Sequence, residues 1–150
     1  MITQAPPGVL DGLRVIDHSR VLAGPYCAML LADYGADVIK IEQPGSGDPT
    51  RQWGPPWFGG GSDLSGVRIP DVFQTPDRSP IRESAYYLTA NRNKRGITLD
   101  LKSAEGQDIA RRLIASADIV IENFMPGTLA GIGLDYHTLS TAHPDLIYCS

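Results

Sequence analysis

The sequence predicts an α/β fold, a Rossmann-like parallel sheet with flanking helices, and three observations support this prediction. Short runs rich in Val and Ile alternate with stretches of helical character along the chain. Runs such as 119–121 are apolar at consecutive positions, as strands buried on both faces are. Helical connections between strands imply right-handed crossovers, which join parallel neighbours. With 42% hydrophobic and 20% charged residues, the 150-residue chain has the composition of a globular domain.

The strands of the sheet are expected in the β-branched runs at residues 13–17, 37–42, 97–101, 118–122 and 146–149. The first helix is expected over 26–34, because Pro25 suits the first turn of a helix and Gly35 suits the position after its end.

Two later helices and one short turn are expected between the remaining strands. Ser103 is a candidate N-cap with Glu105 in the first helical turn, and Asp135 is a candidate cap for a helix over 136–142. Residues 126–132 are expected to form a short turn or helix. The apolar face of the helix after Ser103 is expected to contain Ile109, Ala110, Leu113, Ile114 and Ala117.

Residues 43–85 differ in composition from the rest, since they contain seven Gly and seven Pro. A long segment without regular secondary structure inside a domain is usually functional or mobile. Trp53, Trp57 and Phe58 indicate that part of this segment packs against the protein. The chain ends on an apolar strand, which we interpret as a truncation of a larger protein.

Charge and cysteine content argue against several classes of protein. A net charge of −4 disfavours nucleic acid as the main partner. Cys27 and Cys149 lie in no CxxC or metal-type spacing, so we expect two reduced core thiols, no metal and a cytoplasmic location. The sequence has neither a signal-peptide pattern nor an apolar run long enough for a membrane helix.

Ligands of open parallel sheets bind outside the carboxyl ends of the strands. We therefore expect the segments 18–23, 43–48, 102–103 and 123–125 to meet at one edge. Glu42 could hold a ribose there, but the turn after the first strand lacks GxGxxG, which disfavours a dinucleotide.

The segment 91–95 gathers Arg92, Lys94 and Arg95 in an acidic protein. A phosphate site is one interpretation, and a solvated turn or subunit contact is the other. An extended chain from Arg95 to Lys102 spans about 23 Å. These two cations therefore cannot bind the same phosphate.

Single catalytic residues are weakly indicated. His18 follows a strand and could face a ligand, whereas His137 and His143 are expected to be exposed on a polar helix. No nucleophile elbow, P-loop or HExxH motif is present. Four acids end strands or begin loops without an obvious partner base: Asp17, Glu42, Asp48 and Glu122.

An ordered series of motifs from residue 10 onward resembles the class III CoA-transferases, the family of formyl-CoA transferase, the carnitine CoA-transferase and α-methylacyl-CoA racemase. No single motif is specific to this family, but the series of motifs in this order and at this spacing is. The segments that carry it are 11–17, 23–25, 35–42, 47–51, 91–96, 99–102, 117–124, 126–127 and 133–134.

This resemblance implies that residues 1–150 form a CoA-binding, Rossmann-like N-terminal region, incomplete by itself, of a larger fold that assembles as an interlocked homodimer. Coenzyme A would be bound as substrate, with acyl-CoA and carboxylic acids as partners and no metal. The residues that the resemblance places against CoA are Val21, Leu22, Ala23, Leu99, Lys102, Asn123, Phe124 and Met125.

Two positions depart from the family pattern. Gln43 stands where family members often carry arginine, and Gly131 stands where some do, so phosphate recognition would rely on other groups. Residues 54–85 also exceed the usual family spacing.

The resemblance implies covalent catalysis by an aspartate that would lie beyond residue 150, and Asp145 stands too early to be that residue. Two alternatives remain open at this point. One is an acyl-CoA racemase of the same fold that uses a His/Asp pair. The other is a non-enzymatic nucleotide-binding module.

Overall fold

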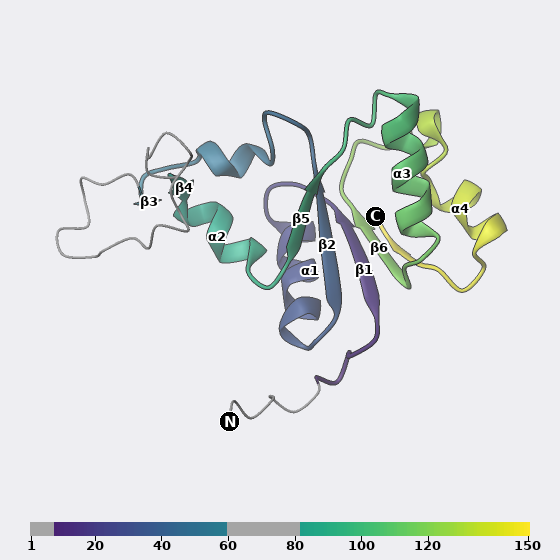
Figure 1. Cartoon of the computed structure of the whole chain (residues 1–150), viewed down its shortest axis with the longest axis horizontal. Helices are drawn as coiled ribbons and strands as arrows, with labels where there is room; N and C mark the ends of the chain where they lie inside the picture. The colour runs from purple at the N-terminus through teal and green to yellow at the C-terminus, as the bar shows by residue number, and fades with distance from the viewer. Residues whose placement is uncertain (1–7, 60–81) are drawn as a thin grey trace.

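The computed structural model describes residues 8–59 and 82–150. Its main feature is a five-stranded sheet in the order β5-β2-β1-β6-β7, with every neighbouring pair parallel (Figure 1). This confirms the predicted α/β parallel sheet. The strands are β1 (Arg14–His18), β2 (Asp37–Glu42), β5 (Arg95–Thr98), β6 (Ile119–Glu122) and β7 (Ile147–Cys149).

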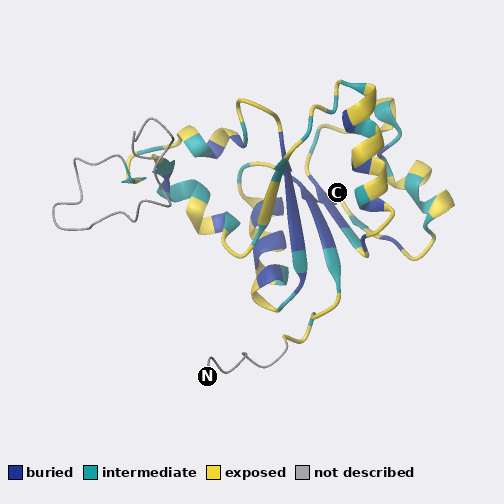
Figure 2. Ribbon diagram, viewed as in Figure 1, coloured by how far each residue is buried: buried dark blue, intermediate teal, exposed yellow. Residues whose placement is uncertain are grey.

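Helices cover both faces of the sheet, and successive strand residues supply the two cores because side chains alternate between faces. Val15 and Val38 pack with α1 (Ala23–Asp33) on one face. Ile16 and Ile39 pack with α3 (Ala104–Ile114) on the other. The central strands are therefore buried along most of their length (Figure 2).

The helix caps expected from the sequence are confirmed. Ser103 Oγ accepts the Gly106 N–H at 3.0 Å, and Asp135 Oδ1 accepts the Thr138 N–H at 3.2 Å at the start of α4 (Tyr136–Ala142). A short 3-10 turn, η3 (Ala130–Ile132), lies in the segment expected to form a turn or helix. Ile109, which was expected on the apolar face of α3, is 40% exposed, whereas Ala110 and Ile114 of the same face are buried.

The strand expected over 97–101 forms two residues earlier, as β5. Ile97 pairs with Ile41, and the Leu99 N–H still donates to the Glu42 carbonyl. The chain then turns, because the Asp100 carboxylate accepts the Lys102 N–H at 3.0 Å. This turn ends the strand and brings Lys102 to the carboxyl edge of the sheet.

The segment 43–85 contains more regular structure than the sequence predicted. It holds η1 (Pro49–Gln52) and the antiparallel pair β3 (Trp57–Phe58) and β4 (Glu83–Ser84). Helix α2 (Ala85–Asn91), which was not predicted, follows directly and is capped by the Ser84 hydroxyl. Trp53 packs against Tyr86 with ring centroids 5.3 Å apart, as the aromatic content of the segment indicated. Most of the unassigned insertion, residues 60–81, lies outside the described residues.

Cys27 and Cys149 are both free thiols, but the prediction that they lie in the core is wrong, because both are exposed. None of the helices in the two described ranges combines the length and hydropathy that a membrane-spanning helix requires.

Candidate functional site

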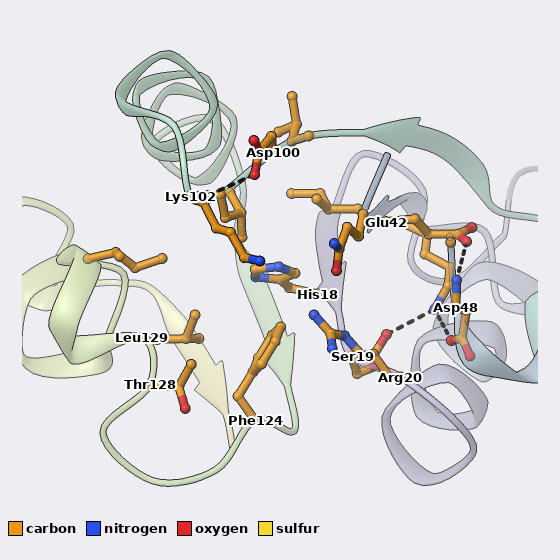
Figure 3. Close-up of a pocket in the computed structure, with 17 residues that line it drawn as sticks. His18, Ser19, Arg20, Glu42, Asp48, Asp100, Lys102, Phe124, Thr128 and Leu129 are labelled. Carbon is orange, nitrogen blue, oxygen red and sulfur yellow. Dashed lines mark hydrogen bonds and ion pairs between the residues drawn. The ribbon is translucent and has the colours of Figure 1, made fainter. Parts of the chain in front are cut away.

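A pocket of about 230 Å³ opens at the carboxyl edge of the sheet (Figure 3). It lies where β1, β2, β5 and β6 end, so all four segments expected to converge contribute to it. Its lining includes His18, Ser19, Arg20, Lys40, Glu42, Gln43, Asp48, Leu99, Asp100, Lys102, Phe124, Thr128 and Leu129.

One wall of the pocket is built from the segment after β1 and the segment after β6. His18 meets the Phe124 ring edge-on, with centroids 4.7 Å apart, and the Arg20 guanidinium lies 4.6 Å from the centroid of the same ring. The Asn123 side chain accepts the Arg20 N–H at 2.8 Å and donates to the Arg20 carbonyl at 2.7 Å. These contacts fix the two segments to each other.

His18 is a neutral side chain at neutral pH. Burial disfavours its charged form and the nearby Arg20 guanidinium adds to this, so the pKa of His18 falls to about 4. Only 7% of the residue is exposed, and its ring makes no hydrogen bond within the described part of the chain. No fully buried side-chain nitrogen or oxygen there lacks a partner, so the His18 ring nitrogens are at least partly accessible, and His18 lines the pocket.

The opposite wall depends on the turn before α3. Gly106 packs so closely on this turn that a Cβ there would lie 2.1 Å from the Asp100 carbonyl oxygen. The Ser103 cap and Gly106 together hold the start of α3 against the turn. Lys102 projects from this turn, and its ammonium has no ion-pair partner among the described residues.

Beneath the pocket lies a buried charge cluster made of Asp17, Lys40, Asp48 and Lys94. Lys94 Nζ lies 2.7 Å from Asp17, and Lys40 Nζ lies 3.1 Å from Asp48 and 3.9 Å from Asp17. All four side chains are at most 2% exposed. Each charge is therefore neutralised by a neighbour within the cluster.

A second network joins the segment after β2 to α2. Arg51 donates to both carboxylate oxygens of Glu42, at 2.7 and 2.6 Å, and Tyr87 donates to Glu42 at 2.9 Å. Burial alone would raise the pKa of Glu42, but the hydrogen bonds from Arg51, the Asp48 N–H and Tyr87 bring this pKa below its usual value. Glu42 is thus an ionised anchor for this wall of the pocket.

The four acids considered from the sequence therefore have structural partners. Asp17, Glu42 and Asp48 belong to the networks above, and Glu122 accepts the Phe124 N–H at 2.7 Å. No group of three or more metal-ligating side chains is found in residues 8–59 and 82–150.

The cations of segment 91–95 also have partners inside the chain. Arg95 pairs with Asp37 at 2.7 Å, and Arg92 pairs with Asp33. Lys94 is buried, so a solvated turn does not describe it. None of these three cations lines the pocket, which leaves the phosphate interpretation of this segment without support.

The residues predicted from the family resemblance are distributed unequally around the pocket. Leu99, Lys102 and Phe124 line it, and Asn123 binds the Arg20 backbone beside it. The segment from Val21 to Ala23 follows Arg20 and leads into α1, and none of its residues lines the pocket. Met125 is 80% exposed and borders a separate depression that also includes His137. All eight remain predicted CoA ligands.

Arg20 is one of the pocket residues that the sequence did not single out. It lies in the segment 18–23, which was expected to reach the site, but sequence position alone does not show that its guanidinium stacks on Phe124. His143 was expected to be exposed, yet its ring nitrogen lies 3.0 Å from the Ala117 carbonyl.

Comparison with known proteins gives consistent matches. The chain is 47% identical over 152 residues to the succinate–glutarate CoA-transferase of Agrobacterium fabrum, covering 100% of this chain and 33% of that protein. It is 41% identical over 141 residues to human succinyl-CoA:glutarate CoA-transferase, covering 94% of this chain and 27% of that protein. The crystal structure of a CAIB/BAIF family protein from Brucella suis superposes with a TM-score of 0.80 at 44% identity. The match covers 97% of this chain and 33% of that protein.

The chain thus spans about a third of the length of the curated relatives it matches. The model of CoA-transferase family III matches residues 10–150. That match includes every strand of the sheet and every wall of the pocket. The chain therefore belongs to CoA-transferase family III.

Proposed function

We propose that this chain forms the CoA-binding region of an enzyme that moves CoA between an acyl-CoA donor and a carboxylic acid acceptor. The observation that carries the proposal is the pocket at the carboxyl edge of the sheet. Leu99, Lys102 and Phe124, three of the residues expected to contact CoA, line it from the ends of two strands. Such an edge is where α/β sheets bind nucleotides.

The chemistry of the pocket suits a ligand with a charged nucleotide and an apolar arm. Lys102 offers a cation to a phosphate, and Leu99 and Phe124 offer apolar surface. The segment from Val21 to Ala23, with Asn123 and Met125, would extend the contact beyond the pocket. We propose residues 1–150 as one CoA-binding region, with the segment 43–85 forming part of its border.

The reaction that we propose is covalent. An aspartate carboxylate, lying beyond Ser150, attacks the donor thioester and forms a mixed anhydride as CoA thiolate leaves. The thiolate then attacks the aspartyl carbonyl, which forms an aspartyl-CoA thioester and releases the donor acid. The acceptor carboxylate repeats the two exchanges and leaves as its CoA thioester, which regenerates the aspartate.

The relatives narrow the substrate class. The proteins from Agrobacterium fabrum and human are both named for transfer involving succinate or succinyl-CoA and glutarate. We therefore propose short dicarboxylic acids as the first acceptors to examine. Both names describe transferases, which favours transfer over racemisation.

We also propose a homodimer in the cytoplasm. The exposed side of α1 and its C-cap carries large apolar side chains one helical turn apart, at Tyr26, Leu30 and the C-cap residue Tyr34. An apolar row of this kind suits a protein partner better than water. The two free thiols suit a reducing compartment.

Titration calorimetry with free CoA tests the proposal. We expect the chain to bind CoA and Lys102→Ala to weaken binding by about tenfold, since a charge-assisted hydrogen bond contributes roughly 1.5–3 kcal/mol. Arg112→Ala is the matched control, because Arg112 is an exposed cation on α3 that does not line the pocket. Absence of CoA binding, or equal affinity in Lys102→Ala and the unchanged chain, would contradict the proposed site.

A further inference from the structure

Arg20 is held in place at the pocket by contacts that leave its charge available. The Asn123 amide holds both the N–H and the carbonyl of Arg20, so the backbone at this residue is fixed on two sides. The guanidinium lies over the Phe124 ring, which orients a cation without neutralising it. Its position is therefore set before any ligand arrives.

Most basic side chains near the sheet have a carboxylate within 4 Å, but the two cations of the pocket wall do not. Arg20 and Lys102 make no salt bridge within the described ranges. The basic residues that form a salt bridge with a carboxylate are Arg14, Lys40, Arg51, Arg92, Lys94 and Arg95.

The acids that line the same pocket do not cancel this charge. Glu42 is paired with Arg51, and Asp48 is paired with Lys40. Asp100 is the remaining acid of the lining, and it is exposed and accepts the Lys102 N–H. The pocket thus presents two unpaired cations against one solvated carboxylate.

His18 adds an uncharged polar group between the two cations. Figure 3 shows the ends of Lys102, His18 and Arg20 pointing towards the middle of the pocket, Lys102 from the turn before α3 and the other two from the end of β1. The ring nitrogens of His18 provide one hydrogen-bond donor and one acceptor in the neutral form. A buried polar group of this kind is best satisfied by a ligand or by water.

We propose that Arg20, acting with Lys102, binds a phosphate group of CoA, and that the His18 ring forms a hydrogen bond with the same ligand. The inference rests on the proposed CoA site and adds two residues to it. A guanidinium is well suited to this role because its planar N–H groups can donate to two phosphate oxygens at once.

The experiment is titration calorimetry of the full chain with CoA, dephospho-CoA and pantetheine. The variants are Arg20→Gln, Arg20→Lys and His18→Phe, with Arg112→Gln as the matched control, and circular dichroism confirms that each variant is folded. We expect Arg20→Gln to weaken CoA binding by roughly 10- to 100-fold, as the loss of a charge-assisted contact implies. Arg20→Lys should recover part of this loss, and Arg112→Gln should bind like the unchanged chain.

The shortened ligands identify the phosphate. A loss in Arg20→Gln that persists with dephospho-CoA places the diphosphate at Arg20, and a loss seen only with CoA places the 3′-phosphate there. His18→Phe keeps an aromatic ring on Phe124 but lacks the ring nitrogens, so we expect CoA binding about 2- to 10-fold weaker.

Two results would overturn the inference while leaving the CoA site itself intact. One is equal CoA affinity in Arg20→Gln and the unchanged chain. The other is an equal loss with pantetheine, which has no phosphate and would therefore report a structural role for Arg20. A chain that binds no CoA at all would instead contradict the proposed function.

Discussion

Two groups of charged side chains lie in the pocket region, and they differ in burial and in ion pairing. In the buried charge cluster, Asp17, Lys40, Asp48 and Lys94 lie next to one another and are almost inaccessible to solvent. On the pocket wall, Arg20 and Lys102 are exposed and have no carboxylate partner in the described residues. The charges of the first group are neutralised by ion pairs within the chain, whereas those of the second have no ion pair in the described residues.

This difference follows from the cost of removing a charge from water. A buried charge is tolerated only when a neighbour of opposite sign and several hydrogen bonds replace the lost solvation. Burial alone would raise the pKa of Asp48, and the hydrogen bonds from Thr50 and the charge of Lys40 lower it instead. An exposed cation needs no such partner, so it stays available for a ligand. Stability and binding should therefore depend on different residues.

The largest effect should come from removing a charge from the buried cluster. Asp17→Asn leaves the Lys94 ammonium without its nearest carboxylate, 2.7 Å away. Burial already lowers the pKa of Lys94, and Asp17 opposes that effect. We expect a loss of about 3–5 kcal/mol in the free energy of unfolding, measured by urea denaturation.

Asp33→Asn is the matched control, because it removes a carboxylate from the more exposed ion pair with Arg92. Its cost should stay below about 1 kcal/mol, as for surface ion pairs in general. Equal losses in the two variants would show that burial does not distinguish the two groups of charges.

An intermediate effect should appear in the pH dependence of stability through His18, whose charge interacts with residues of both groups. The pKa of the ring is about 4 in the folded chain against an ordinary value of 6.5; burial is the main cause, Arg20 and Lys40 lower the pKa further, and Asp17 raises it. Between these values the unfolded chain binds a proton that the folded chain does not. Acidification through this window should therefore destabilise the fold by up to about 3 kcal/mol.

Urea denaturation of the unchanged chain and of His18→Phe between pH 7 and pH 4 measures this contribution. The variant should lose less stability than the unchanged chain on acidification, because Phe cannot take up a proton. His137 and His143 are present in both proteins and cancel in the comparison. Parallel pH profiles would mean that the His18 ring is not held in its neutral form.

The same contrast explains how far the sequence predicts the molecule. Apolar runs such as 119–121 reveal the strands because burial on two faces demands apolar side chains at consecutive positions. The Ser103 cap is visible because its hydrogen bond is local. Helix α2 was missed, since its start depends on Ser84 after a segment rich in Gly and Pro.

The site was predicted by location more than by residue. The carboxyl ends of the strands indicated the edge, and the family resemblance indicated Lys102 and Phe124. The partner of Asp17 was not predictable, because Lys94 lies 77 residues from Asp17 along the sequence. Arg20 was missed for the same reason, since its position depends on Asn123 and Phe124, which follow β6 about 100 residues later in the sequence.

The smallest effect on stability should come from the two pocket cations. Arg20→Gln and Lys102→Gln remove exposed charges without an ion-pair partner in the described residues, so each should change the free energy of unfolding by less than about 0.5 kcal/mol. Urea denaturation without ligand measures this, and the same measurement with CoA should show less stabilisation of the variants than of the unchanged chain. A large loss without ligand would mean that these cations help to hold the pocket wall together. Arg20 and Lys102 would then contribute to folding as well as to ligand binding, and the distinction from the buried charge cluster would not hold.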